Sequence, residues 1–179
     1  MTSRSDPLIN LQLQQVNTPQ SLVYDAFLRE DEETVINLCE DFEEQRLRIL
    51  TIHDDTVLQA APYAKKPSLV LRLLQDLSDR HLDKLTRQNL AGNTILHETA
   101  ISNNAIEVAR KELEKAPGLL CMRNNLGETA LFRTAPYGKQ DMYDFLVKKI
   151  SGYDEAIQKV FLRRRDKTTF LHMAILYFG

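Results

Sequence analysis

The sequence predicts an all-α protein built from repeated pairs of short helices. A motif centred on a threonine recurs four times, at Thr56, Thr94, Thr129 and Thr169. Each of the first three copies is followed by apolar residues spaced three and four apart, which is the spacing of an amphipathic helix. With 179 residues, of which 43% are hydrophobic, the chain has the length of about one domain. A single array of helical repeats accounts for all three observations.

The first elements precede the recurring motif. Residues 1–17 are polar and aperiodic, and we expect them to form a disordered arm. Thr18 and Pro19 form the pattern of an N-cap and a first-turn proline, so a helix is expected to run from there to Asp31. The apolar residues of the helix after it are Val35, Ile36, Leu38, Cys39 and Phe42. Residues 18–179 then constitute the repeat domain.

Four units and the beginning of a fifth share one anatomy. The threonines follow one another at intervals of 38, 35 and 40 residues. A turn with Gly or Asp leads into a threonine that can cap the short helix after it. Longer second helices are expected over 67–77, 104–115 and 140–150. Pro117 and Gly118 are expected to end the helix over 104–115. The fifth unit contains a first helix alone.

The residues 92–100, with the pattern Gly-x-Thr-x-Leu-His-x-x-Ala, resemble the ankyrin repeat. The resemblance covers 18–179, although Gln59 and Phe132 replace the histidine, and Asp54 and Lys167 replace the glycine. It implies a solenoid in which His97 and His172 form hydrogen bonds within their turns. Core leucines would be Leu58, Leu96, Leu131 and Leu171. Small residues at the helix contacts would be Ala60, Ala61, Thr99, Ala100, Thr134, Ala135 and Ala174.

A narrower resemblance rests on three segments. Residues 22–26, 114–120 and 165–174 are similar to those of plant ankyrin proteins that carry a C-terminal PGG membrane domain, the accelerated-cell-death and salt-tolerance type. This resemblance implies an adaptor in stress or immune signalling that is membrane-associated in its full-length form. The PGG region is not in this chain, which stops at Gly179 inside a first helix. We therefore expect either a truncated protein or a short gene product.

Charge and cysteine content limit the function classes. The chain has 23 Lys and Arg residues against 25 Asp and Glu residues, a net charge of −2, which argues against bulk binding to nucleic acid or anionic membranes. Cys39 and Cys121 are too few for a disulfide scaffold or a four-cysteine zinc site. We expect them to be free, buried thiols in a reducing compartment, cytoplasmic or nuclear. No apolar stretch is long enough to span a membrane.

The motifs of catalytic chemistry are absent from the sequence. No two of the six glycines are closer than nine residues, so no glycine-rich phosphate loop is present. His-Glu-x-x-His, Gly-x-Ser-x-Gly and Cys-x-x-Cys patterns do not occur. We expect no enzyme activity, no metal and no cofactor. An enzyme whose site has no recognisable motif is the alternative from another class.

The resemblance implies that partner proteins bind a concave groove formed by the turns and first helices. Tyrosine and arginine contribute most to interface energetics, so a ladder of Tyr63, Tyr137 and Tyr177 beside Arg123 and Arg133 is the sharpest candidate. These tyrosines could instead pack between repeats. The full candidate set also contains Arg87, Asn89, Glu98, Ile101, Asn125 and Met173.

Two C-terminal features leave alternatives open. Residues 163–165 are three consecutive arginines, which suit a solvated loop, a contact with an acidic partner or acidic lipid, or a nuclear regulator that contacts nucleic acid. The fifth unit is apolar, with Phe170, Leu171, Met173, Ile175, Leu176, Tyr177 and Phe178. Its uncovered face predicts either self-association or further protein after it.

Overall fold

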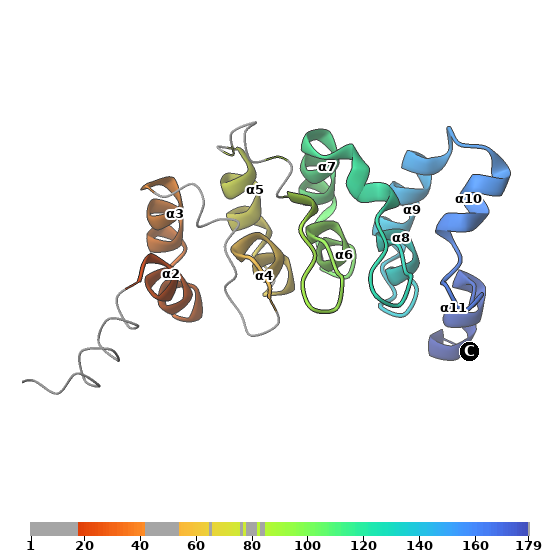
Figure 1. The fold of residues 1–179 in the computed structure, drawn as a ribbon, viewed down its shortest axis with the longest axis horizontal. Coiled ribbons are helices and arrows are strands. Elements are labelled where there is room, and N and C mark those ends of the chain that lie inside the picture. Colours follow the sequence, from red (N-terminus) through yellow and green to blue (C-terminus); the bar gives the residue numbers. More distant parts are fainter. Residues whose placement is uncertain are drawn as a thin grey trace, which may run out of the picture.

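The computed structural model describes residues 18–41, 54–64, 66–75, 77, 82 and 85–178, so the predicted arm 1–17 lies outside it. The described residues are predominantly α-helical, and an isolated antiparallel bridge pairs Arg163 with Thr169. The all-α prediction is confirmed. Figure 1 shows the helices in a row that follows the order of the chain.

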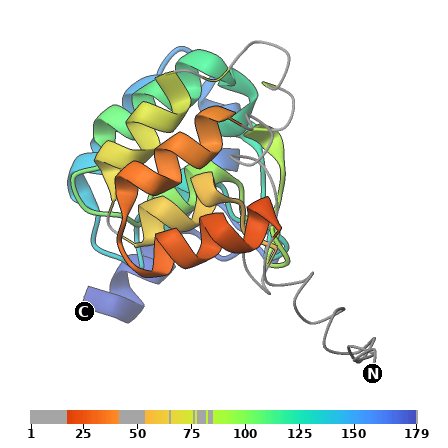
Figure 2. The ribbon, with the colours of Figure 1, turned by 90° about the vertical axis from the view of Figure 1, so that its left-hand side faces the viewer.

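The helices come in pairs. The first pairs are α2 (Pro19–Leu28) with α3 (Glu32–Asp41) and α4 (Val57–Tyr63) with α5 (Pro67–Gln75). The next are α6 (Ile95–Thr99) with α7 (Ile106–Lys115), followed by η3 (Pro117–Cys121), and α8 (Ala130–Arg133) with α9 (Gln140–Ile150). Helices α10 (Glu155–Phe161) and α11 (Phe170–Phe178) end the row. Viewed along the row in Figure 2, the pairs stand one behind another.

Threonine caps begin the first helices, as the sequence predicts. The Oγ1 atoms of Thr18, Thr56 and Thr129 accept hydrogen bonds from backbone amides one turn into α2, α4 and α8. A proline follows Thr18 at the first helical position. Each cap satisfies an amide that the helix itself leaves unpaired, and this fixes where the first helix begins.

The turn before each first helix has one left-handed residue. Asp54, Gly92, Gly127 and Lys167 have φ values of 62°, 75°, 80° and 71°, and each lies two residues before its threonine. Glycine adopts this conformation at little cost, whereas Asp and Lys are strained there. The departures of the second and fifth units from the glycine pattern therefore keep the backbone shape that glycine provides.

Packing between neighbouring pairs forms one continuous core. Helix α4 packs on α6 and α6 on α8, while α3, α5, α7 and α9 pack successively in the second layer. Leu58, Leu96 and Leu131 are at most 1% exposed, so their predicted place in the core is confirmed. Leu171 is 67% exposed, and its predicted core position is wrong because no second helix covers α11 within the described residues.

The structure adds one helix to those predicted from the sequence and corrects one further prediction. The segment between α9 and α11 contains α10, whose Phe161 is buried, and the sequence analysis predicted no element there. Its backbone is held in place because the Oγ1 atom of Thr129 donates a hydrogen bond to the carbonyl of Phe161 at 2.7 Å. Cys39 is buried as expected, but Cys121 is exposed because it ends the short turn of η3 at the surface.

Candidate binding surface

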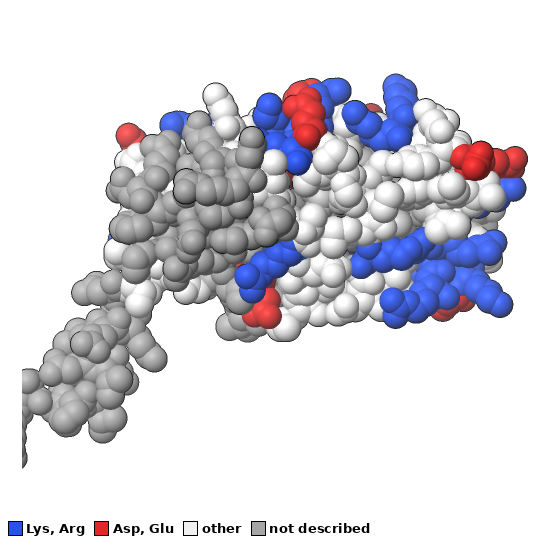
Figure 3. Space-filling view, turned by 45° about the horizontal axis from the view of Figure 1, so that its top comes forward, with Lys and Arg blue, Asp and Glu red and all other residues white. Residues whose placement is uncertain are grey.

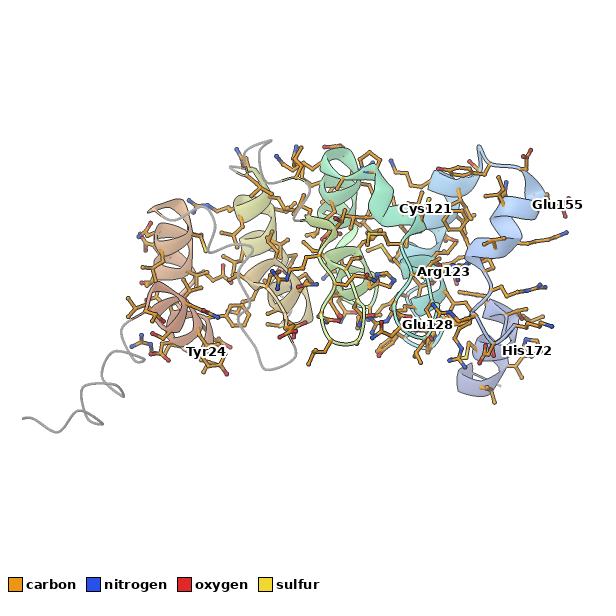
Figure 4. All side chains as sticks on the ribbon, in the orientation of Figure 1. Tyr24, Cys121, Arg123, Glu128, Glu155 and His172 are labelled. Atoms are coloured by element: carbon orange, nitrogen blue, oxygen red, sulfur yellow. The ribbon has the colours of Figure 1, made fainter. Side chains whose placement is uncertain are left out.

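The first helices and the turns that precede α4, α6, α8 and α11 form one surface, which we call the first-helix face. In Figure 4, Tyr24, Glu128 and His172 mark this face from one end of the row to the other. It contains two pockets. The C-terminal pocket, about 620 Å³, is lined by Ala91, Asn93, Asn124, Asn125, Leu126, Glu128, Arg133, Pro136, Tyr137, Arg164 and Met173. The N-terminal pocket, about 470 Å³, is lined by Tyr24, Phe27, Leu28, Asp55, Gln59, Ala60, Ala64, Asn89, Leu90, Ala91 and Glu98.

Buried side chains tie each first helix to the next turn. The Nε2 atom of Gln59 donates to the carbonyl of Asn93 at 2.9 Å, and Nε2 of His97 lies 3.0 Å from the carbonyl of Glu128. Because Nδ1 of His97 accepts from the Thr94 amide at 3.2 Å, the proton of the neutral ring is on Nε2. Burial lowers the pKa of His97 to about 4, which keeps the ring neutral. Gln59 therefore performs the role of the histidine it replaces.

The expected turn hydrogen bonds of the two histidines are present. The Oγ1 atom of Thr94 lies 2.8 Å from Nδ1 of His97, and that of Thr169 lies 2.6 Å from Nδ1 of His172. His97 is fully buried, whereas His172 is exposed at the end of the row. The difference arises because the ring of His97 is covered by the following turn.

A buried polar network forms the floor between the two pockets. Nδ2 of Asn93 donates to Oε1 of Glu98 at 2.7 Å. Nδ2 of Asn124 donates to Oδ1 of Asn93 and to Oε2 of Glu128, both at 3.0 Å. Burial raises the pKa of the Glu98 carboxyl, while the Arg133 guanidinium and the Asn93 amide act in the opposite direction. These bonds hold two carboxylates in set positions below the surface.

Arg133 and Tyr137 adjoin, as predicted, but they have different roles. A guanidinium nitrogen of Arg133 lies 3.5 Å from Oε1 of Glu98, and the two side chains are only 11% and 9% exposed. The guanidinium carbon lies 5.7 Å from the ring centroid of Tyr137, whose side chain is exposed. Arg133 and Glu98 thus form a largely buried ion pair beneath the surface. Of Arg133 and Tyr137, only Tyr137 is exposed to a partner.

Arg123, which the sequence analysis placed beside the tyrosine ladder, donates hydrogen bonds to backbone carbonyls in the structure. Its guanidinium donates to the carbonyls of Gly127, Val160 at 2.6 Å and Arg163 at 2.9 Å. Partial burial, and secondarily the charge of Arg165, lower its pKa. Figure 4 shows Arg123 between α8 and the segment that leads to α11. These hydrogen bonds connect the turn before α8 to the segment before α11, so Arg123 stabilises the packing of neighbouring units.

Two asparagines both shape turns and line pockets. Oδ1 of Asn89 accepts from the amides of Ala91 at 3.1 Å and Asn93 at 2.9 Å, and Asn89 lines the N-terminal pocket. Nδ2 of Asn125 donates to the carbonyl of Leu90 at 2.8 Å, and Asn125 lines the C-terminal pocket. Each pocket wall is therefore held by the turn that forms it.

The remaining candidate residues are divided. Met173 lines the C-terminal pocket, so it joins Asn125, Arg133 and Tyr137 there. Arg87 is exposed and Ile101 half-buried, and neither lines one of the two pockets. The side chains of Tyr63 and Tyr177 lie outside the described residues, so the predicted tyrosine ladder is represented by Tyr137.

The sequence analysis did not identify the residues of α2 that line the N-terminal pocket. Tyr24 and Leu28 lie on α2, are exposed, and line the N-terminal pocket together with Phe27. Their spacing of four residues opposite the buried Val23 and Ala26 is a usable signal, because it places two large apolar groups on the solvent side of an amphipathic helix.

The arginine run 163–165 is divided between solvent and an ion-pair network. Arg164 forms hydrogen bonds with both carboxylate oxygens of Asp166 and lies 3.5 Å from Oε1 of Glu128. The first of these contacts holds the pKa of Asp166 well below its usual range. Arg163 and Arg165 are exposed. Figure 3 shows Lys and Arg side chains in a band toward the C-terminal end of the molecule.

No family model matches the chain, and no curated protein matches it either. In the part of the chain that the structure describes, no group of three or more His, Cys, Asp or Glu side chains is arranged to hold a metal ion. No described helix has the length and apolar character needed to cross a membrane.

Proposed function

We propose that the chain is an ankyrin-repeat protein whose first-helix face binds a partner protein. The observation that carries this proposal is the pair of pockets on that face, each formed where successive turns and first helices meet. The regular threonine caps, the left-handed turn residues and the stacked helix pairs support assignment to ankyrin repeats. Array proteins of this kind use such extended surfaces for binding.

The side chains around the pockets suit an interface. Leu90, Leu126 and Tyr137 are between 49% and 60% exposed, although each is a large residue next to a polar floor. Exposed apolar and aromatic groups surrounded by hydrogen-bonding groups are typical of binding hot spots. Tyr137 combines a ring held over a cation with a hydroxyl that a partner can bind.

Pre-organisation supports the proposal as well. The turns that form the pocket walls are tied to the preceding first helices by Gln59 and His97, and Arg123 ties the turn before α8 to α10. A surface that is rigid before binding loses less conformational entropy when the complex forms. We infer an adaptor without catalytic activity.

The biological setting of the proposal comes from the narrower resemblance. It points to stress or immune signalling in a plant cell, in the cytoplasm, with membrane association in a full-length form. Contact with nucleic acid through residues 163–165 has less support, because Arg164 is already paired with Asp166 and Glu128. Strong salt dependence of binding to DNA or RNA would favour nucleic-acid contact over protein binding as the function.

The test uses the full chain as bait in proximity labelling and pull-down experiments. Tyr137→Ala removes an exposed ring from the C-terminal pocket, and Tyr153→Ala removes an exposed ring that does not line it. We expect a partner that the wild type and Tyr153→Ala bind and that Tyr137→Ala does not bind. The helical content of Tyr137→Ala should equal that of the wild type. A partner retained by both variants would move the interface away from this pocket.

A further inference from the structure

We infer that the N-terminal pocket recognises a lysine or arginine side chain of the partner protein, next to an apolar residue. This inference rests on the proposed function, because it specifies the chemistry of the segment that the first-helix face binds. It is carried by a pocket in which exposed apolar walls meet two carboxylates, one of which, Glu98, is contacted by Arg133 from outside the described lining.

The walls are apolar and accessible. Tyr24 and Leu28 of α2 line the pocket together with Leu90, which belongs to the turn before α6, and the three are 38%, 60% and 60% exposed. Three large exposed apolar residues from two separate units thus meet at one pocket of about 470 Å³. Such a space accepts the aliphatic stem of a long side chain, which removes apolar surface from water on both sides.

Two carboxylates lie in the lining of this pocket. Nδ2 of Asn89 donates to Oδ1 of Asp55 at 2.7 Å and lies 3.5 Å from Oε1 of Glu98. One amide group therefore holds both carboxylates, which come from different units, in fixed positions. A carboxylate has about four acceptor sites, so the contacts with Asn89 do not by themselves saturate either group.

The charge of the lining sets this pocket apart from its neighbour. The C-terminal pocket contains Arg133 and Arg164 beside Glu128, whereas none of the described residues that line the N-terminal pocket is Lys or Arg. Glu98 is nine-tenths buried, and burial raises the pKa of its carboxyl despite the nearby Arg133. A cation that enters the pocket stabilises the charged form of this desolvated group.

An aromatic ring completes the match to a basic side chain. Tyr24 lines the same pocket as the carboxylates, and a guanidinium or ammonium group over such a ring gains cation–π energy. The occupant that satisfies the apolar walls, the ring and the carboxylates together is an amphipathic cationic side chain. An aliphatic side chain would leave both carboxylates without a new partner, and an acidic one would be repelled.

The experiment selects peptides from a random linear library displayed on phage, with the full chain immobilised. Selections are run in parallel on the wild type, Tyr24→Ala and Asp55→Asn, with Asp25→Asn as the matched control. Asp25 is an exposed carboxylate on α2 that does not line the pocket. Selected peptides are then synthesised with arginine and with citrulline, its neutral isostere, and their dissociation constants are measured.

We expect the peptides that depend on Tyr24 to carry arginine or lysine beside an apolar residue. Replacement by citrulline and the Asp55→Asn change should each weaken binding by about tenfold, a loss of about 1.4 kcal/mol, while Asp25→Asn has no effect. Equal affinity for the arginine and citrulline peptides would overturn the inference. So would Tyr24-dependent peptides without a basic residue.

The outcomes separate this inference from the proposed function. Peptides that bind independently of Tyr24 but are lost with Tyr137→Ala would overturn the basic-residue pocket and leave the binding face intact. Failure to select any peptide would count against both, because the first-helix face would then lack a demonstrable ligand.

Discussion

Replacing Glu112 with glutamine should stabilise the protein increasingly as pH rises. Glu112 lies on α7 and is 0% exposed. Oε1 accepts a hydrogen bond from Oγ1 of Thr99 at 2.6 Å, and Oε2 has no hydrogen-bond partner among the described residues. Burial raises the pKa of the carboxyl to about 8, an effect that the Thr99 hydrogen bond only partly offsets. The folded protein therefore holds Glu112 in its neutral form at pH 7.

The sign of the pH effect follows from linkage. A carboxyl whose pKa is higher in the folded state than in the unfolded state contributes most to stability below the unfolded value, here 4.5. That contribution declines as pH rises toward about 8. Each unit of pKa difference corresponds to about 1.4 kcal/mol, so the wild type should lose about 3–4 kcal/mol relative to Glu112→Gln between about pH 5 and pH 8. Such a loss is a large part of the stability of an ordinary domain.

The assay is urea unfolding followed by circular dichroism, with the wild type and Glu112→Gln compared at each pH. Glutamine keeps an oxygen acceptor for Thr99 and stays neutral at every pH. Glu114→Gln is the control, because Glu114 is exposed on the same helix and forms only a surface ion pair with Lys111 at 3.3 Å. It should change the free energy of unfolding by less than about 1 kcal/mol at any pH. Parallel stability curves for wild type and Glu112→Gln would refute the reasoning.

Other predictions concern the turns and the ends of the array. His97→Gln should be tolerated because the second unit already uses glutamine in this role, whereas His97→Ala should cost about 2–3 kcal/mol of stability, measured by urea unfolding. Gly127→Ala should lower the melting temperature, since a Cβ there would meet Arg165 at 2.5 Å in a left-handed backbone, while Gly118→Ala, with nothing within 4 Å, should leave it unchanged. Lys167→Gly should raise stability by about 1 kcal/mol, because it relieves a φ of 71°. The exposed apolar face of α11 should cause concentration-dependent association in sedimentation experiments, and Leu176→Lys should abolish it; a wild type that stays monomeric throughout would contradict this.

Local signals were sufficient to predict the helices. Threonine caps, a first-turn proline and apolar spacing act within a few residues, so α2, α5, α7 and α9 are found close to their predicted positions. The left-handed turn residue can also be predicted from the sequence in the units where it is a glycine. Helix α10 escaped prediction because what holds it, the burial of Phe161 and its bond to Thr129, involves a unit more than thirty residues away.

The candidate site could be predicted only in part from the sequence. Counting along the motif placed Tyr137, Asn125 and Met173 on one surface, and the structure brings them together at the C-terminal pocket, because helical periodicity decides which face a residue occupies. The same count could not show that Glu98 and Arg133 neutralise one another beneath that surface. It also could not show that Arg123 donates to the carbonyls of another turn.

The sequence by itself therefore determined the helical class, the period of the repeat and the position of its turns. Only the tertiary structure decided which polar side chains are exposed and which are consumed in linking the units. It also brought Tyr24, Asp55 and Glu98 from three units to one pocket. The physical reason is range: caps and periodicity act along a few residues of chain, whereas burial, ion pairing and pocket formation depend on which units lie side by side.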